Sequence, residues 1–225
     1  MIDRRRFLQS IVAAATTPSI LHGCVSSGGS TSAAAGLIED PKHVLDLAEG
    51  LEYRVVSRHG KKMSDGLRVP GCHDGMAAFP GADGRIILIC NHELDFSYWL
   101  DSALGDRYPI GPRKIKDKFY DQGRGISPGL GGTTTTIYNP VTGETERQFL
   151  SLGGTEVICA GGPTPWGSWV SCAVCFEGPG RQRVNGARVV REDPHGYVFE
   201  VSASATGLVN PIPIKGMGRF EHEAC

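Results

Sequence analysis

The chain repeats one pattern: a short apolar strand, a turn rich in glycine or proline, and a second strand that runs toward a glutamate. The stretch HDGMAAFPGADGRIILICNHE, residues 73–93, aligns in this way with CAGGPTPWGSWVSCAVCFE, residues 159–177. The stretch TTTTIYNPVTGE, residues 133–144, aligns with HGYVFEVSASATG, residues 195–207. A third copy begins at MGRFEHEA, residues 217–224. Repeated antiparallel units separated by variable loops predict β-propeller blades.

The predicted fold class is therefore all-β. The 31 glycines and 14 prolines suit a chain with many turns. One short helix is expected within PKHVLDLAEGLE, residues 41–52, and residues 97–130 are expected to be mostly loop. A closed propeller needs about four to eight blades, whereas these repeats supply two to three. We therefore expect residues 41–225 to form part of a propeller and the chain to be the N-terminal part of a longer protein.

The first residues indicate a targeting segment. Residues 1–23 contain Arg4, Arg5 and Arg6 followed by Phe7-Leu8 and a mildly apolar stretch. This pattern resembles a twin-arginine export signal, which the export machinery reads as an address. The sequence Leu21-His22-Gly23-Cys24 also resembles a lipoprotein cleavage box, which would attach the protein to a membrane through Cys24. The alternative is an ordinary cysteine near a signal cleavage site. Residues 24–40 are predicted to be a flexible tether.

Charge and cysteine content limit the classes of partner. The formal net charge is −1, so the composition points to neither a nucleic acid nor an anionic membrane as a partner. Seven cysteines are an odd number for an oxidising compartment. Cys172 and Cys175 form a CxxC motif, but a structural zinc site would need a second pair and a redox motif should open a helix. Packing cysteines or a local disulfide are the favoured interpretation.

Polar residues gather where the repeats begin and end. If the repeats are blades, these positions circle one central channel. Carboxylate and amide oxygens there would suit Ca²⁺, whereas a thiolate would favour a transition metal. The candidates have alternatives: histidines that pack, an aspartate that forms a turn, and a buried thiol without a ligand role. The positions are His73-Asp74, Asn91-His92-Glu93, Cys159 and Glu221-His222-Glu223.

Seven motifs occur in a fixed order along the chain: RRRFL, HDGM, NHE, GGTTT, CAGGPTPWGSWVSC, HGYVFEV and GRFEHEA. In this order they resemble the PhoX family of secreted alkaline phosphatases, from about residue 50 to the end. The resemblance implies a six-bladed propeller with iron (Fe³⁺) and calcium (Ca²⁺) in its channel. It also implies hydrolysis of phosphomonoester substrates and export by the twin-arginine route.

Carried onto this sequence, the family pattern assigns three metal ligands: Cys159, Glu93 and Glu223. Further ligands or supporting residues are expected among neighbouring side chains, namely Asp74, Asn91, His92 and His222. No residue is assigned the nucleophile. The rigid corner from Gly161 to Pro165 would direct Cys159 toward the metal while Trp166 and Trp169 pack in the blade.

Two departures leave the activity open. The family continues SCEE after the tryptophan strand, whereas Ala173 and Val174 follow Cys172 here, and Glu177 either replaces the missing acid or does not. The carboxylates and phosphate-binding arginine of later blades lie outside this sequence. Three readings remain: a metal-dependent phosphatase of the cell envelope, a non-catalytic envelope propeller that binds a metal or partner, and a truncated product that folds poorly.

Overall fold

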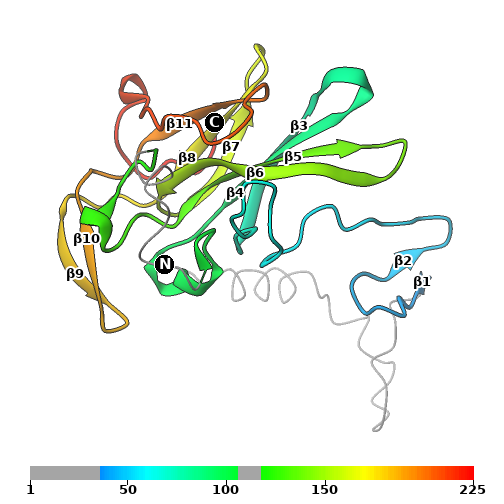
Figure 1. Cartoon of the computed structure of the whole chain (residues 1–225), viewed down its shortest axis with the longest axis horizontal. Coiled ribbons are helices and arrows are strands. Elements are labelled where there is room, and N and C mark those ends of the chain that lie inside the picture. Colours follow the sequence, from blue (N-terminus) through cyan, green and yellow to red (C-terminus); the bar gives the residue numbers. More distant parts are fainter. Residues whose placement is uncertain (1–35, 106–117) are drawn as a thin grey trace, which may run out of the picture. The chain divides into compact units, whose positions relative to one another are not determined.

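The computed structural model describes residues 36–105 and 118–225, and their regular structure is almost entirely β (Figure 1). This part separates into a unit ending at Tyr53 and a unit over Arg54–Cys225. The predicted export signal, Cys24 and most of the tether lie outside the described residues. No helix within residues 36–105 and 118–225 is long and apolar enough to cross a membrane.

The smaller unit contains one antiparallel pair, β1 (Leu37–Ile38) and β2 (Leu47–Ala48). The helix predicted within residues 41–52 is wrong. The Asp40 carboxylate accepts hydrogen bonds from the backbone N–H groups of Lys42, Val44 and Leu45. A side chain that satisfies these N–H groups locally competes with helix formation, and the segment folds as turns between the two strands.

The first sheet of the larger unit has four antiparallel strands in the order β3-β4-β5-β6. They are β3 (His73–Pro80), β4 (Ile86–His92), β5 (Gly131–Asn139) and β6 (Glu144–Thr155). The turn at Thr142-Gly143 joins β5 and β6 as a hairpin. Short 3₁₀ turns interrupt the connections: η1 (Ala82–Gly84), η2 (Phe96–Asp101) and η4 (Gly123–Gly125).

The second sheet has three antiparallel strands in the order β11-β8-β7. They are β7 (Ile158–Pro163), β8 (Ser168–Ala173) and β11 (Val198–Ser202). After β11 the chain adds one bridge, between Phe199 and Pro213, followed by η5 (Lys215–Met217). Between β8 and β11, the chain forms a separate hairpin of β9 (Gly180–Val184) and β10 (Ala187–Arg191), visible in Figure 1.

The sheets confirm the all-β class and the internal repeat. Each begins with the pair that the repeat predicts, β3–β4 and β7–β8, and each adds the predicted third strand beside the second, β5 and β11. The fold therefore matches about two blades of a partial propeller.

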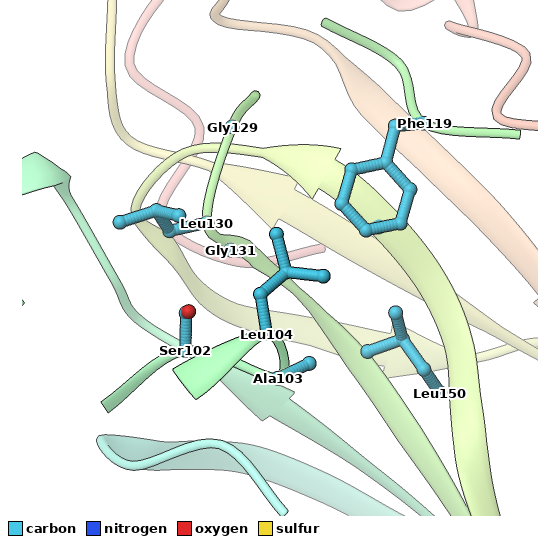
Figure 2. A pocket seen from close by; sticks show the side chains of 9 residues that line it. Ser102, Ala103, Leu104, Phe119, Gly129, Leu130, Gly131 and Leu150 are labelled. Carbon is cyan, nitrogen blue, oxygen red and sulfur yellow. The ribbon is translucent and has the colours of Figure 1, made fainter. Parts of the chain in front are cut away.

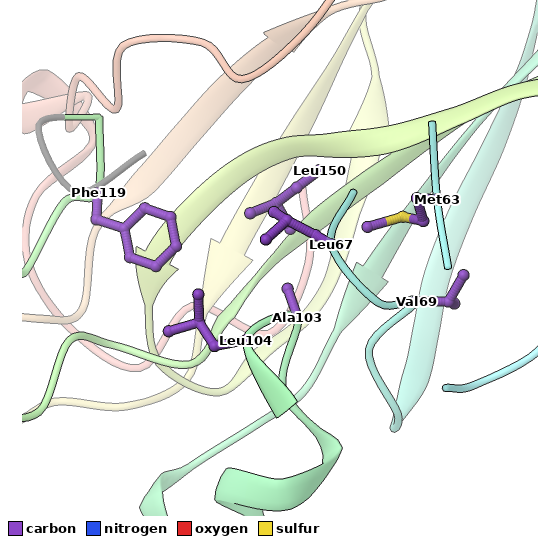
Figure 3. Close-up of a cluster of buried hydrophobic side chains, with 7 residues drawn as sticks. All are labelled: Met63, Leu67, Val69, Ala103, Leu104, Phe119 and Leu150. Carbon is purple, nitrogen blue, oxygen red and sulfur yellow. The ribbon is translucent and has the colours of Figure 1, made fainter. Parts of the chain in front are cut away.

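Among the described residues, three apolar clusters pack the larger unit, and the smallest contains Leu94, Phe96, Leu130 and Val189. Another joins residues of both sheets, including Phe79, Ile89 and Leu152 from the first and Phe199 from the second. Trp169 belongs to it, as predicted, but Trp166 is 73% exposed and instead donates a hydrogen bond to Glu200. The third cluster packs the chain segments that precede β3 and follow η2 against β6 (Figure 3): Met63, Leu67, Val69, Ala103, Leu104, Phe119 and Leu150.

Candidate metal centre

The same irregularity occurs at the start of both sheets. In the first, the register passes from His73↔His92 to Met76↔Cys90, and in the second from Ile158↔Ala173 to Gly161↔Ser171. Each entry strand therefore advances three residues while its partner advances two, which defines a β-bulge. The bulged residues are Asp74-Gly75 and Cys159-Ala160. Bulges are frequent beside functional sites because they change the direction of a side chain.

The residue before each entry strand also has the same conformation. Cys72 and Val157 both have positive φ, 47° and 50°, although neither is glycine. The carbonyl of Cys72 accepts a hydrogen bond from Glu93 N–H, and the carbonyl of Val157 accepts one from Val174 N–H. Asp74 and Cys159 thus occupy equivalent positions of two repeats.

The two bulges lie against each other, and this brings their side chains together. A Cβ atom at Gly75 would lie only 2.8 Å from the Cα atom of Ala160, so the backbones approach as closely as glycine permits. One ligand atom from each of Asp74, Glu93 and Cys159 lies within 4.8 Å of the others. Cys159 Sγ lies 3.5 Å from Asp74 Oδ2 and 3.2 Å from Glu223 Oε1.

The four side chains differ in burial. Cys159 is 2% exposed, Asp74 and Glu93 are partly exposed, and Glu223 is exposed. Such a set offers one soft thiolate and several hard oxygen donors, which fits a transition-metal ion on the sulfur and permits a harder cation on the carboxylates. The structure thus brings together all three predicted ligands and Asp74, which was predicted only as a supporting residue or additional ligand.

Asn91 connects the sheets directly behind Cys159. Its Nδ2 donates to the carbonyls of Cys159 and Ala160, at 2.9 and 3.0 Å. Its Oδ1 accepts from Trp169 Nε1 and Ser171 Oγ, at 2.9 and 2.8 Å. The fully buried amide therefore fixes the second bulge instead of offering an oxygen to a metal.

The predicted histidines make other contacts. His92 Nδ1 lies 2.9 Å from the Gly71 carbonyl and must donate to it, and His92 Nε2 lies 2.9 Å from Thr134 Oγ1. Burial lowers the pKa of His92 to about 3, so the ring is neutral with both nitrogens engaged. His222 packs on the ring of Phe220, and its Nε2 lies 3.4 Å from the Gly218 carbonyl.

A buried ionic network lies behind the second entry strand. Arg191 donates to both carboxylate oxygens of Glu156, at 2.7 and 2.8 Å. His195 Nε2 lies 3.1 Å from Asp121 Oδ2 and 3.5 Å from Glu156 Oε1. Glu156 lies three residues before Cys159, so this network anchors the chain as it enters β7. No sequence pattern pointed to this network, because Asp121, Glu156 and the segment that carries Arg191 and His195 lie far apart in the sequence.

The departure from the family pattern lies at a defined position. In the first sheet, the Cys72 carbonyl accepts a hydrogen bond from Glu93 N–H. In the second sheet, the equivalent Val157 carbonyl accepts one from Val174 N–H. Val174 therefore occupies the position equivalent to Glu93, and an apolar side chain replaces a carboxylate. Glu177 is exposed and does not belong to the cluster of Asp74, Glu93 and Cys159.

Other thiols in this region have partners outside the cluster. The CxxC residues do not contact each other as a pair: Cys172 Sγ lies 3.2 Å from Cys225 Sγ, whereas Cys175 Sγ lies 3.7 Å from Glu156 Oε2. Burial raises the pKa of Cys175 to about 12 and that of Cys90 to about 11. Both lie outside the cluster of Asp74, Glu93 and Cys159.

Two hollows of the larger unit differ in their relation to the cluster. A cleft of about 280 Å³ reaches Asp74 and His73 and is also lined by Ser57 and Thr134. A small cavity of about 10 Å³ lies beside the apolar cluster around Phe119 (Figure 2). Its polar side chain, Ser102, already donates to the Trp99 carbonyl. Only the cleft borders the candidate metal centre.

These features define an all-β, propeller-type protein with thiolate and carboxylate donors at the entry of its sheets. A family model described as alkaline phosphatase PhoX matches residues 33–136 and 128–225. The chain therefore belongs to the PhoX alkaline phosphatase family, and the resemblance seen in the sequence is confirmed. Searches of curated proteins and of solved structures found no match.

Proposed function

We propose that the protein to which this chain belongs is an exported phosphomonoesterase that uses iron and calcium. The observation that carries the proposal is the meeting of Asp74 and Cys159 at equivalent bulges, with Glu93 and Glu223 beside them. Membership of a phosphatase family supports the reaction class. The arginine motif at residues 4–6 supports export to the periplasm or beyond, with membrane attachment only if Cys24 carries a lipid.

Cys159 would hold iron through its sulfur, and carboxylates of Asp74, Glu93 and Glu223 would hold iron or calcium through oxygen. These ions would supply Lewis acidity and neutralise the charge of the phosphate oxygens. The Cys159 thiol lies within hydrogen-bonding distance of two carboxylates, so its proton has acceptors when the thiolate is needed. Metal binding would release that proton, which makes the affinity pH-dependent.

The surrounding residues position and shield these donors. Asn91 holds the backbone of Cys159 and Ala160, and the Glu156–Arg191 pair anchors the preceding segment. Burial of Cys159 excludes water from the sulfur. The cleft beside Asp74 gives a phosphomonoester a route to the carboxylate side of the centre.

The test uses the product of the complete reading frame, purified in its wild-type form and as Cys159→Ala. We expect iron in the wild-type protein and turnover of p-nitrophenyl phosphate, with both lost in Cys159→Ala. Cys175→Ala is a matched control, because that thiol faces Glu156 and lies outside the cluster. A wild-type protein with neither iron nor turnover would contradict the proposal.

A second function is favoured by one observation, the valine at the position equivalent to Glu93. With one acid fewer, the centre can bind a cation without completing a catalytic site, as in a non-catalytic envelope propeller. Calcium binding measured by calorimetry together with absent phosphatase activity would support this function. Restoring the acid through Val174→Glu should then raise metal affinity, whereas phosphatase turnover by the wild-type protein would exclude it.

A further inference from the structure

One pair of thiols near the candidate metal centre has no part in the proposed function. Cys172 is completely buried on β8, and its Sγ lies 3.2 Å from the Sγ of Cys225. Two sulfur atoms at this separation are closer than ordinary contact distance but have not formed a bond of about 2.05 Å. The partners are 53 residues apart in sequence.

The backbone around Cys225 is held in place by several contacts. His222 N–H donates to the Ala173 carbonyl, and Ala160 N–H donates to the Glu223 carbonyl. A Cβ atom at Gly162 would lie 2.0 Å from the Cys225 carbonyl oxygen, so the last residues can lie against β7 only because position 162 is glycine. The approach of the two thiols therefore follows from the packing of residues 222–225 on the second sheet.

We propose that Cys172 and Cys225 form a disulfide when the protein meets an oxidising compartment, independently of any phosphatase activity. Cys225 is exposed and can react with an external disulfide RS–SR, whereas buried Cys172 can reach only its neighbour. The sulfur of Cys225 first attacks RS–SR and releases one RS⁻. The sulfur of Cys172 then attacks the mixed disulfide and releases the second RS⁻. Both thiols lose their protons, and the external disulfide takes up the two electrons.

The bond would join the segment that carries Glu223 to the strand next to β7. It would hold Glu223 beside Cys159 and would remove two neighbouring sulfurs from the set of metal donors. The two cysteines of the CxxC motif would then have separate roles, because Cys172 faces Cys225 whereas Cys175 faces Glu156. Cys159 would remain as the thiol that faces the carboxylates.

The test is peptide mapping of the full chain isolated without reductant from an oxidising compartment. The protein is denatured, alkylated with iodoacetamide and digested without reduction. We expect a cross-linked pair of peptides containing Cys172 and Cys225, lighter by two hydrogen atoms than the two thiol peptides together. The pair should disappear after dithiothreitol and return after incubation with oxidised glutathione.

Cys175→Ser is the matched control, because it changes the other thiol of the CxxC motif and should keep the cross-link. Cys225→Ser should lose the cross-link and leave Cys172 alkylated. Alkylation of both cysteines in the wild-type protein after oxidised glutathione would overturn the proposal. So would a bond from Cys225 to any other cysteine or to a second molecule. Mapping of the wild-type chain decides the question even if a variant fails to fold.

Discussion

The bulge in β3 and the bulge in β7 present Asp74 and Cys159 in equivalent positions, but their surroundings differ. β3 is mostly exposed or partly exposed, and His73 beside the first bulge contacts the partly exposed Ser57. Half of the residues of β7 are buried, including Cys159, and its bulge is fixed by Asn91 and anchored through Glu156. The sulfur donor therefore lies on a rigid support, whereas the carboxylates retain access to solvent. Under the proposed function, this difference would hold one ion firmly and leave the carboxylate side open to substrate.

The largest effect is expected from removing one partner of the buried Glu156–Arg191 ion pair, which anchors the chain as it enters β7. Arg191→Met leaves the Glu156 carboxylate charged and buried, which we expect to lower the free energy of unfolding by about 3–5 kcal/mol. Urea denaturation followed by fluorescence measures the loss. Adding Glu156→Gln to the same variant should recover most of it, because neither charge is then left unpaired. An unchanged urea midpoint for Arg191→Met would show that the network is not an anchor.

Replacing Asn91 tests whether its hydrogen bonds hold the β7 bulge in place. Asn91→Leu keeps a similar volume but removes hydrogen bonds to Cys159, Ala160, Trp169 and Ser171, for an expected loss of about 2–3 kcal/mol. Ser171→Ala removes one of these bonds and should cost about 1 kcal/mol. Metal affinity should fall further in Asn91→Leu than in Ser171→Ala. Equal losses in the two variants would contradict a bracing role.

Gly75 tests the contact between the two bulges. Its missing side chain leaves room for the Ala160 backbone, so Gly75→Ala forces the bulges apart and should cost about 1–2 kcal/mol. Iron affinity should drop as well, because Asp74 and Cys159 separate. Gly207→Ala is a matched control, since nothing lies within 4 Å of a Cβ atom there. Similar thermal shifts in the two variants would rule out the close contact.

The last comparison concerns the pH dependence that Asp121, in the network behind β7, gives to stability. Burial opposes its ionisation, but hydrogen bonds from His195 and from the N–H groups of Gly123, Glu192 and Asp193 lower the pKa of Asp121. A carboxyl whose folded pKa lies below its unfolded value stabilises the protein above the unfolded value near 3.8. That stability is lost as the pH falls through this value toward the folded pKa. The free energy of unfolding, measured by urea titration between pH 5 and pH 2, should therefore fall less steeply in Asp121→Asn than in the wild type.

Sequence patterns predicted the strands because each strand pair is local and its turn is marked by glycine or proline. The β9–β10 hairpin was missed although its turn, Asn185-Gly186, is a strong hairpin signal, with φ of 48° and 82° at the two residues. The helix predicted within residues 41–52 failed because the Asp40 side chain takes up the backbone donors on which a first helical turn would depend.

The residue types of the candidate site could be predicted from the sequence, but the roles of the individual residues could not. The repeat placed Cys159, Glu93 and Glu223 where strand pairs begin or end, and the family resemblance made them the predicted ligands. Asp74 was expected only as a further ligand or supporting residue, because Asp-Gly commonly marks a turn. Its place in the cluster depends on the bulge, which requires a register that only the paired strands define. The bracing role of Asn91 depends on contacts 68 to 80 residues away in sequence, which no local pattern encodes.

The equivalence of the two bulges has a consequence for how such a centre can change over evolutionary time. A duplicated strand pair copies the backbone geometry, and a substitution at the bulged residue then changes the donor from oxygen to sulfur without new architecture. In this molecule the same bulge presents an oxygen donor at Asp74 and a sulfur donor at Cys159. The backbone position and the donor atom that it presents can therefore change independently. Proteins with the same framework can then differ in the metal that they select.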